Sequence, residues 1–338
     1  MRGESIGVNL VTKKCLIELL AILFLTSIAH VHAQQMKIPR IGYLSASGRA
    51  GSPDPQLEAF TKGMLELGYV NGKNIRFAVR NAEGIQNRIP ELIAELVKLN
   101  VDVIVVSVLP AIRAAKQATQ TIPIVMMSTA DPVATGLVDS LARPGGNLTG
   151  VSTLVRDLSG KRLELLRESI PKLSRVGVLW DMNGPAPAIG FKEYQAAARD
   201  LKLTIQSVPV KGPRPEFEEA LLTAIKGQAG AVVVIRNSLL NQHFKQIMQL
   251  TLTHRLPTMT EGGDYVDAGG LMSYAAIQKE NARRAAVFVD RILKGANPAE
   301  LPIERPTKFE LVINLKTAKQ IGLTIPPNVL ARADRVIK

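Results

Sequence analysis

The sequence predicts an α/β protein of two doubly wound, Rossmann-like lobes with parallel sheets, joined by a multi-crossing hinge. Short apolar, β-branched runs alternate with amphipathic helical patterns along most of the chain. The alternation occurs twice, at a nearly constant spacing. The length of 338 residues also suits two domains, at about 150 residues each.

The clearest unit lies near the middle of the first half. Residues 101–106 form a run of β-branched apolar side chains interrupted only by Asp102, which predicts a strand buried on both faces of a parallel sheet. A helix is expected at 111–120 and a second buried strand at 122–127. Ligands of open parallel sheets bind beyond the carboxyl ends of the strands, where this unit carries small polar residues.

Two pairs of similar segments reveal an internal repeat. Residues 40–44 (RIGYL) match 175–179 (RVGVL), with an offset of 175 − 40 = 135. Pro123 and Pro257 open similar apolar segments, with an offset of 257 − 123 = 134. Because both pairs share nearly one offset, we predict two similar lobes in tandem. Clefts between such lobes bind small molecules.

The remaining elements follow from the same patterns. Further strands are predicted at residues 37–45, 75–80, 175–180, 203–209, 231–235 and 309–314. Further helices are predicted at residues 56–67, 87–99, 159–169, 190–201, 216–227, 239–253, 280–294 and 316–321. The expected crossings between lobes are residues 151–157, 269–274 and 298–306, with the glycine-rich segment 269–274 as a hinge. The expected lobes are 37–152 plus 275–303 and 153–274 plus 304–338.

The first 33 residues have the pattern of a secretory signal peptide. A basic start with Lys13 and Lys14 precedes an apolar run at 16–29, and small residues at 31–33 predict cleavage after Ala33. An uncleaved anchor is the alternative, but the run is short for a membrane span. Cys15 lies in this segment, so the mature chain has no cysteine and suits an oxidising compartment.

The net charge is +13, which by itself favours an anionic partner. Residues 1–33 contribute 3 − 2 = +1, so the mature chain keeps 13 − 1 = +12. The basic residues are spread along the chain, and no zinc-finger, RRM or basic-zipper signature occurs. We therefore predict no nucleic-acid binding.

Signals for catalysis are poor. The histidines of the mature chain, His243 and His254, do not have the spacing of zinc ligands. The sequence contains no G-x-S-x-G elbow, Walker A motif or dinucleotide-binding fingerprint after a strand. We expect no enzyme activity, no metal and no cofactor.

Polar residues gather where predicted strands end. The candidate ligand-binding residues that share this position or lie by the predicted hinge are Ser45, Ser47, Ser107, Ser128, Thr129, Asp181, Arg236, Asn237, Glu261 and Tyr274. Hydroxyls and helix N-terminal amides suit a carboxylate, and Arg236 also suits one. Asp181, Glu261 or Asp264 would suit an ammonium group, and Tyr274 a flat ligand.

Each candidate has a structural alternative. Ser107 and Ser128 suit helix N-caps. Arg236 suits an ion pair between the lobes or at the surface. Tyr274 and Trp180 suit packing as well as ligand contact.

Several motifs carry a resemblance to a known family. They are residues 40–44, 131–133 with 136–138, 143–150, 269–274, 292–298 and 314–318. On these motifs, nearly the whole mature chain resembles the ABC-transporter substrate-binding proteins of the tryptophan/tyrosine-type group, which have the type I periplasmic-binding fold.

The resemblance implies a periplasmic protein whose lobes close on a small solute. It also implies that the protein delivers the solute to a cognate permease with a separate ATPase. Contact with the membrane is expected only through that permease. Family ligand positions lie in the strand-end loops, yet residues 45–47 and 107–110 offer no aromatic ring. The absence of rings argues against an aromatic ligand. We expect a small carboxylate-bearing or amino-acid-like ligand. An exported ligand sensor for a receptor, or an exported enzyme on the same scaffold, are the alternatives.

Overall fold

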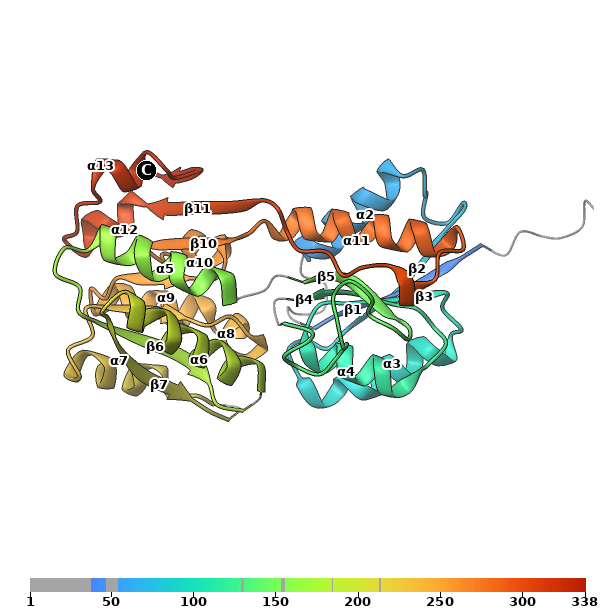
Figure 1. Cartoon of the computed structure of the whole chain (residues 1–338), viewed down its shortest axis with the longest axis horizontal. Helices are drawn as coiled ribbons and strands as arrows, with labels where there is room; N and C mark the ends of the chain where they lie inside the picture. Colours follow the sequence, from blue (N-terminus) through green and yellow to red (C-terminus); the bar gives the residue numbers. More distant parts are fainter. Residues whose placement is uncertain (1–37, 47–53, 129–130, 153–155, 184, 213) are drawn as a thin grey trace, which may run out of the picture. The chain divides into compact units, whose positions relative to one another are not determined.

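The computed structural model describes residues 38–46, 54–128, 131–152, 156–183, 185–212 and 214–338 (Figure 1). The predicted signal peptide, its cleavage site and Cys15 lie outside these ranges. The described residues form two sheets, each with helices on both faces.

The first sheet has five parallel strands within the described residues, in the order β2-β1-β3-β4-β5. They are β1 (Arg40–Ser45), β2 (Arg76–Asn81), β3 (Val103–Val106), β4 (Ile124–Ser128) and β5 (Leu148–Ser152). Strand β3 is buried throughout: Val103 and Val105 pack on one face of the sheet, and Ile104 and Val106 on the other. A continuous apolar run thus forms a central strand, as predicted.

Helices cover both faces of this sheet. One face carries α3 (Ile89–Lys98), preceded by η1 (Gln86–Arg88), and α4 (Leu109–Ala118). The other carries α2 (Pro55–Glu66) and α11 (Gln278–Leu293), which lie side by side although far apart in sequence (Figure 1). A Cβ on Gly63 of α2 would lie 3.0 Å from that of Ala286 in α11, so a glycine permits this close approach. The short helix η2 (Pro298–Glu300) follows α11.

The second sheet has seven strands within the described residues, in the order β12-β11-β10-β9-β8-β6-β7. They are β6 (Arg175–Asp181), β7 (Thr204–Val210), β8 (Ala231–Val234), β9 (Thr258–Thr260), β10 (Met272–Ala276), β11 (Phe309–Asn314) and β12 (Arg335–Ile337). The order β7-β6-β8-β9-β10 repeats β2-β1-β3-β4-β5, which confirms the predicted tandem units. The sheet is mostly parallel, as predicted, but strand β11 runs antiparallel to β10.

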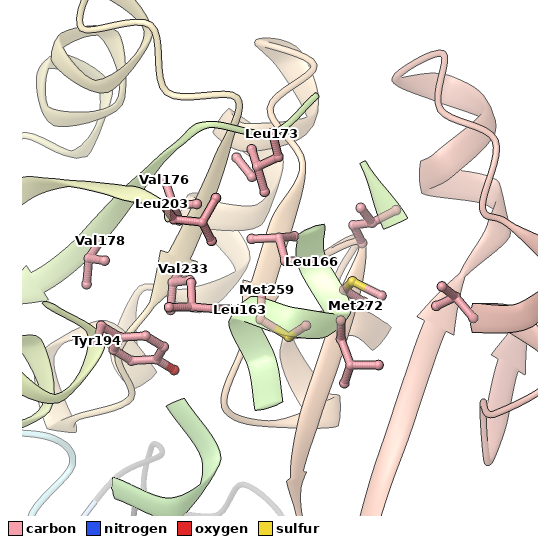
Figure 2. Close-up of a cluster of buried hydrophobic side chains, with 14 of the residues drawn as sticks. Leu163, Leu166, Leu173, Val176, Val178, Tyr194, Leu203, Val233, Met259 and Met272 are labelled. Atoms are coloured by element: carbon pink, nitrogen blue, oxygen red, sulfur yellow. The ribbon is translucent and has the colours of Figure 1, made fainter. Parts of the chain in front are cut away.

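The second sheet is also covered by helices. They are α5 (Arg156–Ser169), α6 (Pro185–Asp200), α7 (Phe217–Lys226), α8 (Ser238–Gln242), α9 (Phe244–Thr253), α10 (Gly263–Asp267), α12 (Leu315–Gln320) and α13 (Pro327–Leu330). Figure 2 shows one core cluster, in which Leu163 and Leu166 of α5 pack with Val176, Met259 and Met272 of the strands. The cluster fixes α5 against the sheet and positions the site described below.

Two local predictions are wrong for identifiable reasons. The single helix expected at 239–253 is two helices, because His243 has φ −108° and ψ 9° and interrupts α8 before α9 begins. Strand β5 is absent from the strands that the sequence pattern predicts. Its Gly150 has φ +132°, and a Cβ there would lie 2.2 Å from the Met126 carbonyl oxygen, so a strand forms only because residue 150 is glycine.

The hinge expected at 269–274 is also wrong. Tyr274 pairs with Leu311 inside the second sheet, and β10 continues to Ala276 before α11 begins on the first sheet. Of the crossing expected at 151–157, residues 153–155 lie outside the described residues. In the crossing expected at 298–306, Glu304 forms a β-bridge with Val151. The lobe boundaries stay a prediction.

Candidate functional site

Strand ends in the first sheet bring hydroxyl-bearing residues to one edge. Strands β1 and β4 end at Ser45 and Ser128, and Ser107 directly follows β3, the strand between them in the sheet. Ser45 is buried. The N-cap of α4 is Val108, so the alternative that Ser107 caps this helix is wrong. The three serines thus lie on adjacent strands, as the sequence predicts.

Two further candidates of this edge, Ser47 and Thr129, lie outside the described residues. The carboxylate of Asp131 accepts backbone hydrogen bonds from Val133 and Ala134 at 2.9 and 3.0 Å. Asp131 therefore stabilises a turn.

In the second sheet, side chains at the ends of β6 and β8 are joined directly. Asp181 ends β6 and is 3% exposed. Its Oδ2 accepts a hydrogen bond of 2.8 Å from Asn237, and its Oδ1 one of 2.9 Å from the backbone of Asn183. Asn237 also caps α8, since its Oδ1 accepts from the Leu240 amide at 2.8 Å. Asp181 thus shapes the loop after β8, and its carboxylate is already engaged.

Glu261 follows β9 and is buried against a buried arginine. Arg162 of α5 donates from Nη1 to Glu261 Oε1 at 2.9 Å, with the two side chains 2% and 5% exposed. Tyr194 of α6 donates to the same oxygen at 3.0 Å. The Nε of Arg162 donates to the Tyr274 carbonyl in β10 at 2.8 Å. The predicted ammonium partner Glu261 therefore has strong internal partners.

Arg236 is held at three points. Its backbone amide donates to Glu261 Oε2 at 2.9 Å. Its guanidinium makes a two-pronged contact with Asp264, from Nη1 at 2.6 Å and Nη2 at 2.8 Å, and lies 5.7 Å from the centre of the Tyr265 ring. Arg236 therefore forms an ion pair with a residue that follows β9 of the same sheet, as the ion-pair alternative predicts. Asp264 is 44% exposed, so this pair borders solvent.

The aromatic candidates pack against a neighbouring strand or a helix that covers the same sheet. The Tyr274 ring stacks on Phe309 at 5.9 Å between centroids. Trp180 stacks on Phe191 at 5.0 Å and donates from Nε1 to Ser207 at 2.9 Å. These contacts realise the packing alternative for both rings.

The buried network favours charged arginine and neutral tyrosine. Burial lowers the pKa of the Arg162 guanidinium, but Tyr194 and Glu261 outweigh it, so the pKa is raised overall. Burial is the main cause that raises the pKa of Tyr194, with Arg162 acting in the opposite direction. Tyr194 therefore keeps its proton and serves as a donor to Glu261.

Arg162 and Tyr194 are not among the residues that the sequence pattern singles out. A signal for Arg162 was available: it lies four residues after Leu158 and three and four before Leu165 and Leu166, all buried. An arginine on the apolar stripe of a helix needs a buried partner. Which partner it finds depends on the tertiary fold.

Comparisons with known proteins agree with this architecture. A family model described as "ABC transporter substrate binding protein" matches residues 51–337. The chain belongs to this family.

Individual relatives of this substrate-binding protein cover most of its length. A tyrosine-binding protein of Clostridioides difficile (strain R20291) is 24% identical over 80% of this chain and 78% of its own. An ABC domain from Streptococcus pneumoniae, solved in complex with L-Trp, is 27% identical with a TM-score of 0.82, covering 88% of this chain and 99% of that one. A conserved domain protein from Vibrio cholerae is 26% identical with a TM-score of 0.81, covering 89% and 100%.

These findings confirm the predicted family, the type I periplasmic-binding fold and the substrate-binding function within an ABC transporter system. The family is one of solute-binding proteins. Within the described ranges, no helix has both the length and the apolar character that crossing a membrane requires.

Proposed function

We propose that this substrate-binding protein is the periplasmic receptor of an ABC importer and binds an L-amino acid, with aromatic side chains as the first candidates. The observation that carries the proposal is a cluster of hydrogen-bonded residues after β6, β8 and β9, in a chain of this family. Asn237 bonds to Asp181 there, and the Arg236 amide bonds to Glu261. Binding of L-Trp and of tyrosine by two similar proteins supports an amino acid as the ligand, and makes aromatic side chains the first to test although residues 45–47 and 107–110 offer no ring.

The proposed ligand lies between the two lobes and contacts both. Ser45, Ser107 and Ser128 would offer hydroxyls from the first sheet, and Arg236 and Asn237 would offer donors from the second. A solute that bridges two lobes stabilises the closed state through contacts that the open state lacks. Hinge closure is therefore the proposed mechanism.

Export and the transport partners belong to the same proposal. Residues 1–33 have the basic, apolar and small-residue regions of a signal peptide, with cleavage after Ala33. The periplasm is then the working compartment. A permease in the membrane would accept the solute, and a separate ATPase would power its transport.

A thermal-shift screen tests the ligand class. Residues 34–338 would be purified, stripped of ligand by unfolding and refolding, and heated with amino acids, small carboxylates, nucleosides or sugars. A ligand at 100 times its Kd adds about 2.7 kcal/mol of stability. We expect a clear shift with L-tryptophan or L-tyrosine. A shift with sugars or nucleosides, and none with amino acids, would refute the proposed class.

A further inference from the structure

The two carboxylate oxygens of Glu261 accept hydrogen bonds from different parts of the fold. Oε1 accepts from the side chains of Arg162 and Tyr194. Oε2 accepts from the backbone amide of Arg236. One oxygen is therefore fixed by helices α5 and α6, and the other fixes the loop that follows β8.

The hydrogen bond from the Arg236 amide to Glu261 lies directly after the last hydrogen bond that this segment makes within the sheet. The amide of Ile235 still donates to the Leu179 carbonyl of β6 at 3.0 Å, as in a sheet ladder. The next amide, that of Arg236, donates to the Glu261 side chain instead. Glu261 thus sets the direction in which the chain leaves β8, and Asn237 follows at once.

Burial of this ion pair points to a role beyond stability. Arg162 and Glu261 are 2% and 5% exposed. A well-packed apolar pair of similar volume is often as stable as a buried ion pair, because desolvation offsets the Coulombic attraction. What the ion pair provides in addition is a carboxylate with fixed orientation.

We propose that Arg162 and Glu261 are positioning residues that hold the loop after β8 in its ligand-binding shape without contacting the ligand. The inference rests on the proposed function, since that loop carries the proposed ligand donors of Arg236 and Asn237. Arg162 also bonds the Tyr274 carbonyl in β10, two residues before that strand ends. The pair therefore fixes the loop relative to the strand that leads out of the second sheet.

Two variants of the same network separate positioning from general stability. Glu261→Gln keeps the size of the side chain but leaves one acceptor oxygen, which cannot serve both Arg162 and the Arg236 amide. Tyr194→Phe removes a hydroxyl from the network but leaves both of those contacts in place. Glu261→Asp is the second test variant, because it keeps the charge while shortening the reach between the two partners.

The first readout needs no ligand: amide hydrogen exchange in the peptide spanning residues 235–238. We expect exchange there to be about tenfold faster in Glu261→Gln and Glu261→Asp, and within about twofold of the parent protein in Tyr194→Phe. Unchanged exchange in both Glu261 variants, or equal acceleration in Tyr194→Phe, would overturn the inference.

The second readout is the Kd for L-tryptophan and L-tyrosine. We expect binding about tenfold weaker in the Glu261 variants and nearly unchanged in Tyr194→Phe, even if its melting temperature falls. Equal affinities in all variants would overturn a role in binding. If the parent protein binds neither amino acid, the proposed ligand is wrong, and the exchange result still decides whether Glu261 positions the loop.

Discussion

The side-chain amide of Asn237 donates a hydrogen bond of 2.8 Å to the carboxylate of Asp181. The two residues are 56 positions apart and lie at the ends of neighbouring parallel strands. Their contact shows why polar residues after separate strands form one site: strand ends in a parallel sheet meet at one edge.

Replacement of Asn237 by alanine should destabilise the protein by about 2 kcal/mol. The change removes the cap of α8, at about 1 kcal/mol, and a donor to the buried Asp181 carboxylate, at about 1–3 kcal/mol. Denaturant unfolding measures the difference. Asn297→Ala is the control, because Asn297 caps the short η2 and is exposed. Equal losses in both variants would contradict this account of Asn237.

Arg236→Ala should weaken amino-acid binding by about tenfold with little loss of stability. Its partner Asp264 is 44% exposed, so the broken ion pair should cost only about 0–1 kcal/mol. The control is Arg332→Ala, which breaks an ion pair with Glu168 away from the strand ends. Titration calorimetry compares the affinities. An unchanged Kd in Arg236→Ala would remove this residue from the proposed site.

Gly150→Ala should prevent stable folding. The added Cβ would lie 2.2 Å from the Met126 carbonyl oxygen, and φ at this position is +132°. Backbone atoms cannot yield as a flexible side chain does. Gly146→Ala is the matched control: φ is +60° and nothing lies within 4 Å, so the loss should be about 1–2 kcal/mol. Circular dichroism and expression yield measure both, and a stably folded Gly150→Ala protein would contradict this prediction.

Tyr69 should make folding stability fall at alkaline pH. Burial, followed by the hydrogen bond to Asp290, raises the pKa of Tyr69 from 10.0 to about 12. Because the folded-state pKa is the higher one, this contribution is complete below pH 10 and is lost as pH rises toward about 12. Denaturant unfolding of the parent protein and Tyr69→Phe measures it. Their stability difference should shrink between those pH values, and a constant difference would refute the assignment.

Much of the fold follows from local pattern. Residues 103–106 are apolar without interruption, and β3, which they form, is central and covered on both faces. Strand β5 has no such run, and its pairing depends on Gly150 approaching β4. The antiparallel β11 was predicted as a strand with the same bounds. Its direction depends on where the chain returns to the sheet, which sequence pattern does not encode.

The site is predictable to a lesser degree. Asp181, Arg236, Asn237 and Glu261 were selected because they follow strands, and the structure joins them through hydrogen bonds. Their partners were not predictable in the same way. Arg162 reaches Glu261 across 99 residues of sequence, a contact that exists only once α5 packs on the sheet.

The most direct test of solute binding is isothermal titration calorimetry of ligand-stripped residues 34–338 with L-tryptophan and L-tyrosine, with recovery of the ligand afterwards. The account predicts saturable binding at one site per chain and recovery of the amino acid unchanged. Absence of binding to every amino acid tested, or conversion of the ligand into a product, would contradict it.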